Sequence, residues 1–336
     1  MSDFLNRMKS AAKADLKTIV LPEGEDPRTI VAANKIIEEG LAKLVILGNP
    51  DEIDVPGATV IDPRNAEKHE EYAQKFAELR AKKGVTIEQA RAQVMDATYF
   101  GTMMVKMGDA DGLVSGACHS TADTLRPALQ ILKTAPGTKL VSAFFVMCTD
   151  TPQFGTDGTL IFADCGLNIN PSSDELSEIA IASAHSWSTF MGNVEPHVAM
   201  LSYSTMGSAG GEVAKKVQEA VKFCKEKAPE LAIDGDLQLD AAIVPTVAQL
   251  KLPAPPLPVR PTCSCSPTSR LETSATSWSS ASPALTPTAP SCRASPSRLT
   301  TFRAAALPTT SWVSLPSPPS RLRWLSSGHI LGLQEV

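Results

Sequence analysis

Short apolar runs alternate with amphipathic stretches over the first 250 residues of the chain. The runs Thr18–Leu21 and 44–47 predict two buried strands. Between them, apolar residues recur at helical spacing until Gly40, and the same periodicity returns over 66–81 and 86–107. Strands that alternate with helices in this way predict a parallel sheet with helices on both faces.

Hydroxyl residues gather where the next strand meets its helix, in the segment GLVSGACHSTADTLRPALQIL at 112–132. Ser120 and Thr121 suit the start of that helix, and Arg126 follows about one and a half turns later. The free N–H groups of a helix start attract anions, and an arginine adds a full charge. An anion site and an ordinary capped helix with a solvated arginine both fit this pattern.

A second hydroxyl- and glycine-rich loop follows the predicted strand at 198–201. It is followed by an amphipathic helix, which again predicts an anion loop, and an ordinary capped loop is the alternative. The segment does not match a P-loop, because no Gly-Lys-Ser/Thr sequence follows. The candidate residues of this loop are Ser204, Thr205, Gly207 and Ser208.

Other polar residues give weaker signals. His119 lies beside the first loop and suits a hydrogen-bonding role better than proton transfer. Asp109 and Asp111 lack a third carboxylate at ligand spacing, so we interpret them as turn residues and predict no metal site. Arg80 is a solvated helix residue or a ligand contact, and Cys165 is by default a buried structural thiol.

Length and composition restrict the class of protein. A chain of 336 residues with 43% hydrophobic residues predicts about two domains with sizeable cores. No apolar run is long enough for a membrane span, and the first residues do not match a secretory signal. Seven cysteines without a pairing pattern predict reduced thiols, and therefore a cytoplasmic protein.

Five motifs occur in one order along the chain: IVLPEGEDPRTIVAA from 19, GDADGLVSGACHSTADTLRPALQI from 108, FADCGLNINPSSDELSEIAIASA at 162–184, LSYSTMGSAGG from 201 and the predicted strand LDAAIVP at 239–245. Together they make residues 14–250 similar to the phosphate acetyl- and butyryltransferases, and the acetyl branch is the closer match. The resemblance implies an α/β fold of two three-layer α/β/α domains with parallel-rich sheets and a cleft between them, similar to isocitrate and isopropylmalate dehydrogenases. Domain one would cover 1–145 and be completed by the C-terminal end, and domain two would cover 146–250.

The same resemblance implies the reaction, which is reversible acetyl transfer between acetyl-CoA and phosphate. No metal or further cofactor is expected, and the family is expected to form homodimers. By matching motif, Arg80 and Arg126 would contact CoA or phosphate. The acyl-phosphate pocket would be lined by Ser120, Thr121, Ser204, Thr205, Gly207 and Ser208.

Residues 251–336 differ in character from the rest of the chain. They hold eight basic and two acidic residues, a net charge of +6, whereas residues 1–250 hold 23 basic and 34 acidic residues, a net charge of -11. Fourteen of the 26 prolines lie between 252 and 327, a density that opposes strands and helices. A disordered linker, a basic nucleic-acid-binding arm and a coding frame slipped by one base all fit this composition.

The slipped frame explains most of these features. With the frame moved by one base, 260–280 can encode ANVLVFPDLEAGNIGYKLVQ and 297–307 can encode PLNDLSRGCS, which resemble the family's C-terminal motifs in order. The basic charge is then a by-product of GC-rich codons, so no nucleic-acid partner is expected. We therefore predict that 251–336 is an out-of-frame, disordered tail.

The slipped frame also bears on catalysis. The resemblance places a Ser-Arg pair and a following Asp in the lost segment, so the catalytic residues cannot be assigned. We expect the 336-residue chain to be inactive and poorly folded beyond residue 250. One alternative is a catalytically dead remnant that still binds CoA or phosphate. Another, an oxidoreductase of related architecture, is disfavoured by the missing metal-binding aspartates and nucleotide fingerprint.

Overall fold

The computed structural model describes residues 3–134, 139–148, 152–164, 166–192, 194–252, 262–265, 300–305 and 330–335. The chain divides into two compact units. The N-terminal unit comprises Leu5–Thr138 with Ala306–Leu333. The middle unit comprises Lys139–Ala305 with the two chain ends, Met1–Phe4 and Gln334–Val336.

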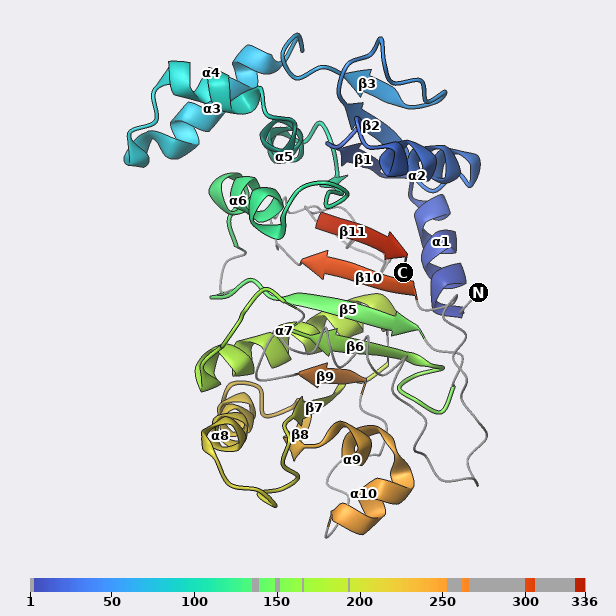
Figure 1. Cartoon of the computed structure of the whole chain (residues 1–336), viewed down its shortest axis with the longest axis vertical. Coiled ribbons are helices and arrows are strands. Elements are labelled where there is room, and N and C mark those ends of the chain that lie inside the picture. Colours follow the sequence, from blue (N-terminus) through green and yellow to red (C-terminus); the bar gives the residue numbers. More distant parts are fainter. Residues whose placement is uncertain are drawn as a thin grey trace, which may run out of the picture. The chain divides into compact units, whose positions relative to one another are not determined.

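Parallel strands build the sheet of the N-terminal unit (Figure 1). Their order is β3-β2-β1-β4-β11, and every pairing among them is parallel. The strands are β1 (Thr18–Leu21), β2 (Lys43–Leu47), β3 (Thr59–Ile61), β4 (Gly112–Leu113) and β11 (Ile330–Glu335). The helices at this end of the chain are α1 (Asp3–Ala14), α2 (Pro27–Glu38), α3 (His69–Arg80), the 3-10 turn η1 (Ala81–Lys83), α4 (Ile87–Val94), α5 (Ala97–Met107) and α6 (Thr121–Ile131).

Helices cover both faces of this sheet. Neighbouring residues of a strand point to opposite faces, so Val20 and Leu21 of β1 show what covers each face. Leu21 and Ile46 join a buried cluster with Ala33 of α2. On the other face Val20 lies against Gly101 of α5, where an added Cβ would come within 3.0 Å of its Cγ1. The N-terminal unit is therefore a three-layer α/β/α structure.

The middle unit contains a mixed sheet in the order β10-β5-β6-β9-β7-β8. β10–β5 and β5–β6 are antiparallel, and the remaining pairs are parallel. Its strands are β5 (Ala143–Cys148), β6 (Thr159–Ala163), β7 (His197–Leu201), β8 (Ala232–Leu237), β9 (Cys263–Cys265) and β10 (Thr300–Ala305). Its helices are α7 (Ser173–Met191), α8 (Glu212–Lys227), α9 (Leu239–Ile243) and α10 (Pro245–Lys251).

Both faces of the middle sheet are covered as well. Phe162 and Leu201 pack in one cluster with Ile243 of α9. On the opposite face the thiol of Cys263 lies 3.7 Å from the carbonyl oxygen of Ser183 in α7. The predicted α/β class with parallel-rich sheets is confirmed, while the cleft between the domains stays a prediction.

One sequence prediction of secondary structure is wrong. The segment 239–245 is the short helix α9 followed by the start of α10, because β8 already occupies the strand position beside β7 and the two alanines of LDAAIVP favour a helix. The segment 86–107 is helical as predicted and forms the two helices α4 and α5, because Asp96 caps a new helix by accepting hydrogen bonds from the N–H groups of Thr98 and Tyr99.

Three strands of the structure lie within the predicted tail. Within the described residues these are β9, β10 and β11. β9 lies between β6 and β7, and the N–H of Thr262 donates to the carbonyl oxygen of His197 at 2.9 Å. Cysteine is a small apolar side chain that suits this buried position. The rest of the predicted tail lies outside the described residues.

Candidate functional site

The first predicted loop joins β4 to α6 in the N-terminal unit. Ser120 caps the helix as predicted, since its Oγ accepts from the N–H of Asp123 at 3.2 Å and donates to the carboxylate of Asp123 at 2.6 Å. Thr121 is exposed in the first turn, where helix N–H groups have no intrahelical partner. The helix start therefore presents free donors beside a hydroxyl group.

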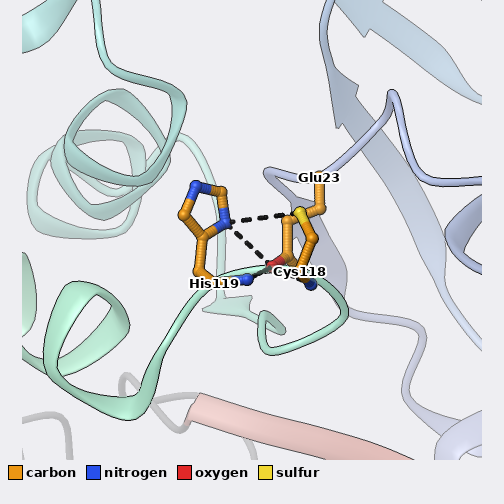
Figure 2. Close-up of side chains that lie close together, drawn as sticks. All are labelled: Glu23, Cys118 and His119. Atoms are coloured by element: carbon orange, nitrogen blue, oxygen red, sulfur yellow. Dashed lines mark hydrogen bonds and ion pairs between the residues drawn. The ribbon is translucent and has the colours of Figure 1, made fainter.

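A buried carboxylate, Glu23, holds the backbone of this loop (Figure 2). Its Oε2 accepts from the N–H groups of Gly116 and Ala117 at 2.9 and 2.8 Å. Its Oε1 accepts from the N–H groups of Cys118 and His119, both at 2.9 Å, and from Nδ1 of His119 at 2.8 Å. The N–H groups at 116–119 are thus satisfied by an anion that belongs to the chain itself.

Sequence reasoning missed Glu23, which lies 93 residues before Gly116 in the chain. The available signal was an acidic residue two positions after the end of a buried strand, since parallel strands end at the same edge of a sheet. In contrast, the structural role expected for His119 agrees with its hydrogen bond to this carboxylate.

The electrostatics of the loop keep Glu23 charged. Burial raises its pKa, but the N–H groups of Cys118, Ala117 and His119 and the His119 ring more than offset this effect, so the pKa falls to about 2. Burial and the negative charge of Glu23 raise the pKa of the Cys118 thiol. At neutral pH the loop therefore combines an ionised carboxylate with a protonated thiol.

Glu23, Cys118 and His119 are also the residues that could hold a metal ion in the described part of the chain, since their ligand atoms lie within 4.8 Å of one another. The distance between His119 Nδ1 and Glu23 Oε1 is 2.8 Å. Two ligands of a tetrahedral zinc ion would lie about 3.3 Å apart, given bonds of about 2.0–2.1 Å. These side chains are arranged as a hydrogen-bond network and not as a ligand set.

Two predicted arginines lie around Tyr99 in the same unit. The buried Nε of Arg80 has no hydrogen-bond partner among the described residues. Arg126 is largely exposed, and only a 3.4 Å contact joins it to Asp123. Burial raises the pKa of Tyr99, and the nearby charges of Arg126 and Arg80 oppose that rise. Both cations therefore lie near one phenol; Arg126 also pairs with the exposed Asp123, and the Nε of Arg80 has no partner in the described structure.

The second predicted loop joins β7 to α8 in the middle unit. Ser204 Oγ accepts from the N–H of Ala209 at 3.1 Å, and Ser208 Oγ accepts from the N–H of Thr205 at 3.0 Å. The hydroxyl of Thr205 donates to Oε1 of Gln238 at 3.2 Å. Three of the predicted hydroxyl groups thus brace the loop, and of these only Ser208 is exposed.

A buried carboxylate, that of Asp236, also accepts a hydrogen bond from this loop. The N–H of Gly207 donates to Oδ1 of Asp236 at 3.1 Å, and Asp236 is 1% exposed. Its second oxygen, Oδ2, has no hydrogen-bond partner among the described residues. The structure therefore brings Ser204, Thr205, Gly207 and Ser208 together around one loop, with Asp236 as a neighbour that the sequence did not reveal.

The two groups of predicted residues belong to different units. Arg80, Ser120, Thr121 and Arg126 lie in the N-terminal unit, and the four loop residues Ser204, Thr205, Gly207 and Ser208 lie in the middle unit.

The remaining candidates have structural surroundings or lie elsewhere. Asp111 accepts from the N–H of Thr18 at 2.8 Å, and Asp109 accepts from the hydroxyl of Tyr72 at 2.5 Å. Both aspartates therefore brace the entry to β4, as interpreted from the sequence. Cys165 lies outside the described residues.

Parallel strands that end in hydroxyl- and glycine-rich loops, each followed by a helix, are typical of α/β proteins that bind small anionic ligands. Comparison with known proteins gives the family: residues 3–268 match the family described as phosphate acetyl/butaryl transferase. The chain belongs to this transferase family.

Individual relatives agree with this assignment. A phosphate acetyltransferase of Acetivibrio thermocellus is 55% identical over 255 residues, which cover 74% of this chain and 76% of the relative. The solved EutD phosphotransacetylase of Staphylococcus aureus is 40% identical with a TM-score of 0.72, covering 82% of this chain and 86% of that one. A phosphotransacetylase of Streptococcus pyogenes is 36% identical with a TM-score of 0.73, covering 83% and 87%.

These comparisons support the acyltransferase prediction and lend no support to a catalytically dead remnant. None of the described helices is long and apolar enough to cross a membrane.

Proposed function

We propose that this chain catalyses reversible transfer of an acetyl group between acetyl-CoA and phosphate. The observation that carries the proposal is the family match over residues 3–268, together with 55% identity to a phosphate acetyltransferase. In the synthetic direction the CoA thiol loses its proton and attacks the carbonyl carbon of acetyl phosphate. The new thioester bond forms as the bond to phosphate breaks, and inorganic phosphate leaves.

The reaction needs cationic and hydrogen-bonding groups for two anionic substrates. We propose that Arg80 and Arg126 contact CoA or phosphate. The unpartnered Nε of Arg80 and the long, exposed pairing of Arg126 with Asp123 support this role, because both guanidinium groups keep donors for an anionic ligand.

We propose a narrower role for the two loops than their sequence alone suggested. In the first loop, Glu23 occupies the N–H groups at 116–119, so the donors left for substrate are the free N–H groups at the start of α6 and the exposed hydroxyl of Thr121. Ser120, whose hydroxyl donates to Asp123, would line the pocket as the cap of that helix. The second loop would contribute the exposed Gly207 and Ser208, while Ser204 and Thr205 brace it.

The catalytic residues stay unassigned, because the resemblance places them in the tail. We propose that the tail from about residue 252 is read out of frame; the family match ends at residue 268 and so does not extend over most of the tail. Restoring the frame would return the Ser-Arg pair and the Asp. Loss of one oxyanion-stabilising group typically slows an enzyme by about 100- to 1,000-fold.

The substrates proposed here are small molecules, with no metal, further cofactor or nucleic acid. The described cysteines Cys118, Cys148, Cys224, Cys263 and Cys265 form no disulfide, which supports the proposed cytoplasmic location, with acetate metabolism as the setting. A homodimer is proposed on the family resemblance alone.

The test is formation of acetyl-CoA from acetyl phosphate and CoA by the 336-residue chain and by a chain with the restored frame. We expect the restored chain to turn over at least about 100-fold faster. Butyryl phosphate serves as the matched substrate, and we expect it to react more slowly than acetyl phosphate. A folded restored chain that makes no acetyl-CoA would contradict the proposed function.

A further inference from the structure

We propose that Glu23 is a positioning residue for substrate binding: its carboxylate acts as an internal anion around which the loop 116–119 folds, and it thereby fixes the start of α6. The proposal rests on the function proposed above, because it concerns the affinity of the same site. Nothing in the comparisons assigns a role to this residue.

The position of Glu23 is itself rigid. The N–H of the next residue, Gly24, donates to the carbonyl oxygen of Leu47 at 3.2 Å. A Cβ at Gly24 would lie 2.6 Å from that oxygen, so only glycine allows the chain to pass so close to β2. The carboxylate therefore projects from a backbone that is anchored to the sheet.

The loop has little else to hold it. Its first residue, Gly116, has a φ of +122°, a conformation that side-chain-bearing residues rarely adopt. Apart from Glu23, one distant side chain of the described structure bonds to the backbone of 116–119: Arg28 donates to the carbonyl oxygen of Ala117. Five hydrogen bonds to one carboxylate are thus the main restraint on the described loop.

This restraint lies next to the proposed substrate contacts. His119, the last residue held by Glu23, precedes Ser120, which caps α6, and Thr121 begins that helix. The orientation of the cap decides where the free N–H groups of the first turn point. Losing the carboxylate would release the loop and spread those donors over several orientations, at a cost to ligand affinity.

Whether removal of the Glu23 charge weakens or tightens CoA binding distinguishes a positioning role from a purely electrostatic one. A negative charge behind an anion site repels the ligand, so removing it would tighten CoA binding if charge were all that mattered. If the carboxylate positions the loop, its removal weakens binding despite the loss of repulsion. The variant Glu23→Gln keeps the size of the side chain and removes its charge, so the two effects give opposite results.

The experiment measures CoA binding to the full 336-residue chain by titration calorimetry, for wild type and for Glu23→Gln. We expect Glu23→Gln to bind CoA at least about tenfold more weakly. The matched control is Asp111→Asn, because Asp111 links β4 to the N–H of Thr18 at the opposite end of β1. We expect this control to stay within about twofold of wild type, since it lies away from the loop.

Hydrogen exchange at the amides of Ala117, Cys118 and His119 provides the readout on the loop itself. We expect these amides to lose protection in Glu23→Gln and to keep it in Asp111→Asn.

If Glu23→Gln fails to fold, the variant Glu23→Asp tests the proposal instead, because it keeps the charge and shortens the reach of the side chain. Weaker CoA binding by this variant supports positioning, and unchanged binding overturns it.

Equal or tighter binding by folded Glu23→Gln would overturn the proposal while leaving the proposed function intact. Equal weakening by Asp111→Asn would also overturn it, because the effect would then reflect general loss of stability. Absence of CoA binding by the wild-type chain is a separate result, which would contradict the proposed binding site itself and the positioning role with it.

Discussion

The ionised state of Glu23 should make the stability of the chain depend on pH in a way that one substitution removes. The perturbation is Glu23→Gln, compared with wild type between pH 7 and pH 3.5. Because the hydrogen bonds to the folded carboxylate favour its charged form, protonation of Glu23 weakens the folded state.

The size of the effect follows from the two pKa values. The pKa falls from an ordinary value of 4.5 to about 2 in the folded protein, and each unit corresponds to about 1.36 kcal/mol. The carboxylate therefore contributes about 3 kcal/mol above pH 4.5, as an upper figure for a side chain that is 5% exposed. This contribution is lost as the pH falls from about 4.5 towards 2, and about 1.4 kcal/mol of it is gone by pH 3.5.

The assay is urea unfolding followed by circular dichroism at a series of pH values. Other carboxylates also titrate, so the quantity of interest is the difference in unfolding free energy between wild type and Glu23→Gln. We expect this difference to be constant from pH 7 to about 5.5 and to shrink by about 1.4 kcal/mol at pH 3.5. A difference that stays constant over the whole range would refute the reasoning.

Two further predictions test the arginines and the tail strand. Arg80→Gln and Arg126→Gln should each weaken CoA binding about tenfold in calorimetry, because a charge-assisted hydrogen bond is lost. The control variant Arg91→Gln, at an exposed arginine that pairs with Glu70, should leave CoA binding unchanged. Equal weakening by all three variants would contradict the assignment of Arg80 and Arg126 to CoA binding. Alkylation of the native chain, followed by mass spectrometry, should modify the exposed Cys118 well before the fully buried Cys263 of β9, and equal rates would show that β9 is not seated in the sheet.

Much of the local structure could be predicted from the sequence. The strand at Thr18–Leu21 and the cap at Ser120 follow from apolar periodicity and capping chemistry, which act over a few residues. The helix predicted at the end of the second loop also appears, as Glu212–Lys227. These features depend on neighbours in the chain, so the pattern of residues contains the necessary information.

Features that depend on distant partners could not be predicted in the same way. The role of Glu23 requires β1 and β4 to lie side by side, and the partnership of Asp236 with Gly207 requires β8 beside β7. The apolar residues of the segment 239–245 fit a strand or a short helix equally well, and the sequence prediction was a strand. The structure has the helix α9 there, because β8 fills the position beside β7 in the sheet.

The strand β9 in the tail could not be predicted either, because its partners are distant in the sequence. The composition of the tail opposes regular structure, yet the short run at Cys263–Cys265 fits an open position between two parallel strands. The pairing partners for these three residues come from β6 and β7, so the local sequence alone contains no sign of them.

We infer that this chain is a phosphate acetyltransferase, and we propose that its tail is read out of frame. The most direct test is the rate of acetyl-CoA formation from acetyl phosphate and CoA, measured for the restored-frame chain beside the 336-residue chain. We expect CoA-dependent product from the restored chain and a rate at least about 100-fold lower from the 336-residue chain. No product from a folded restored chain would contradict the assigned activity, and equal rates would contradict the role given to the lost tail.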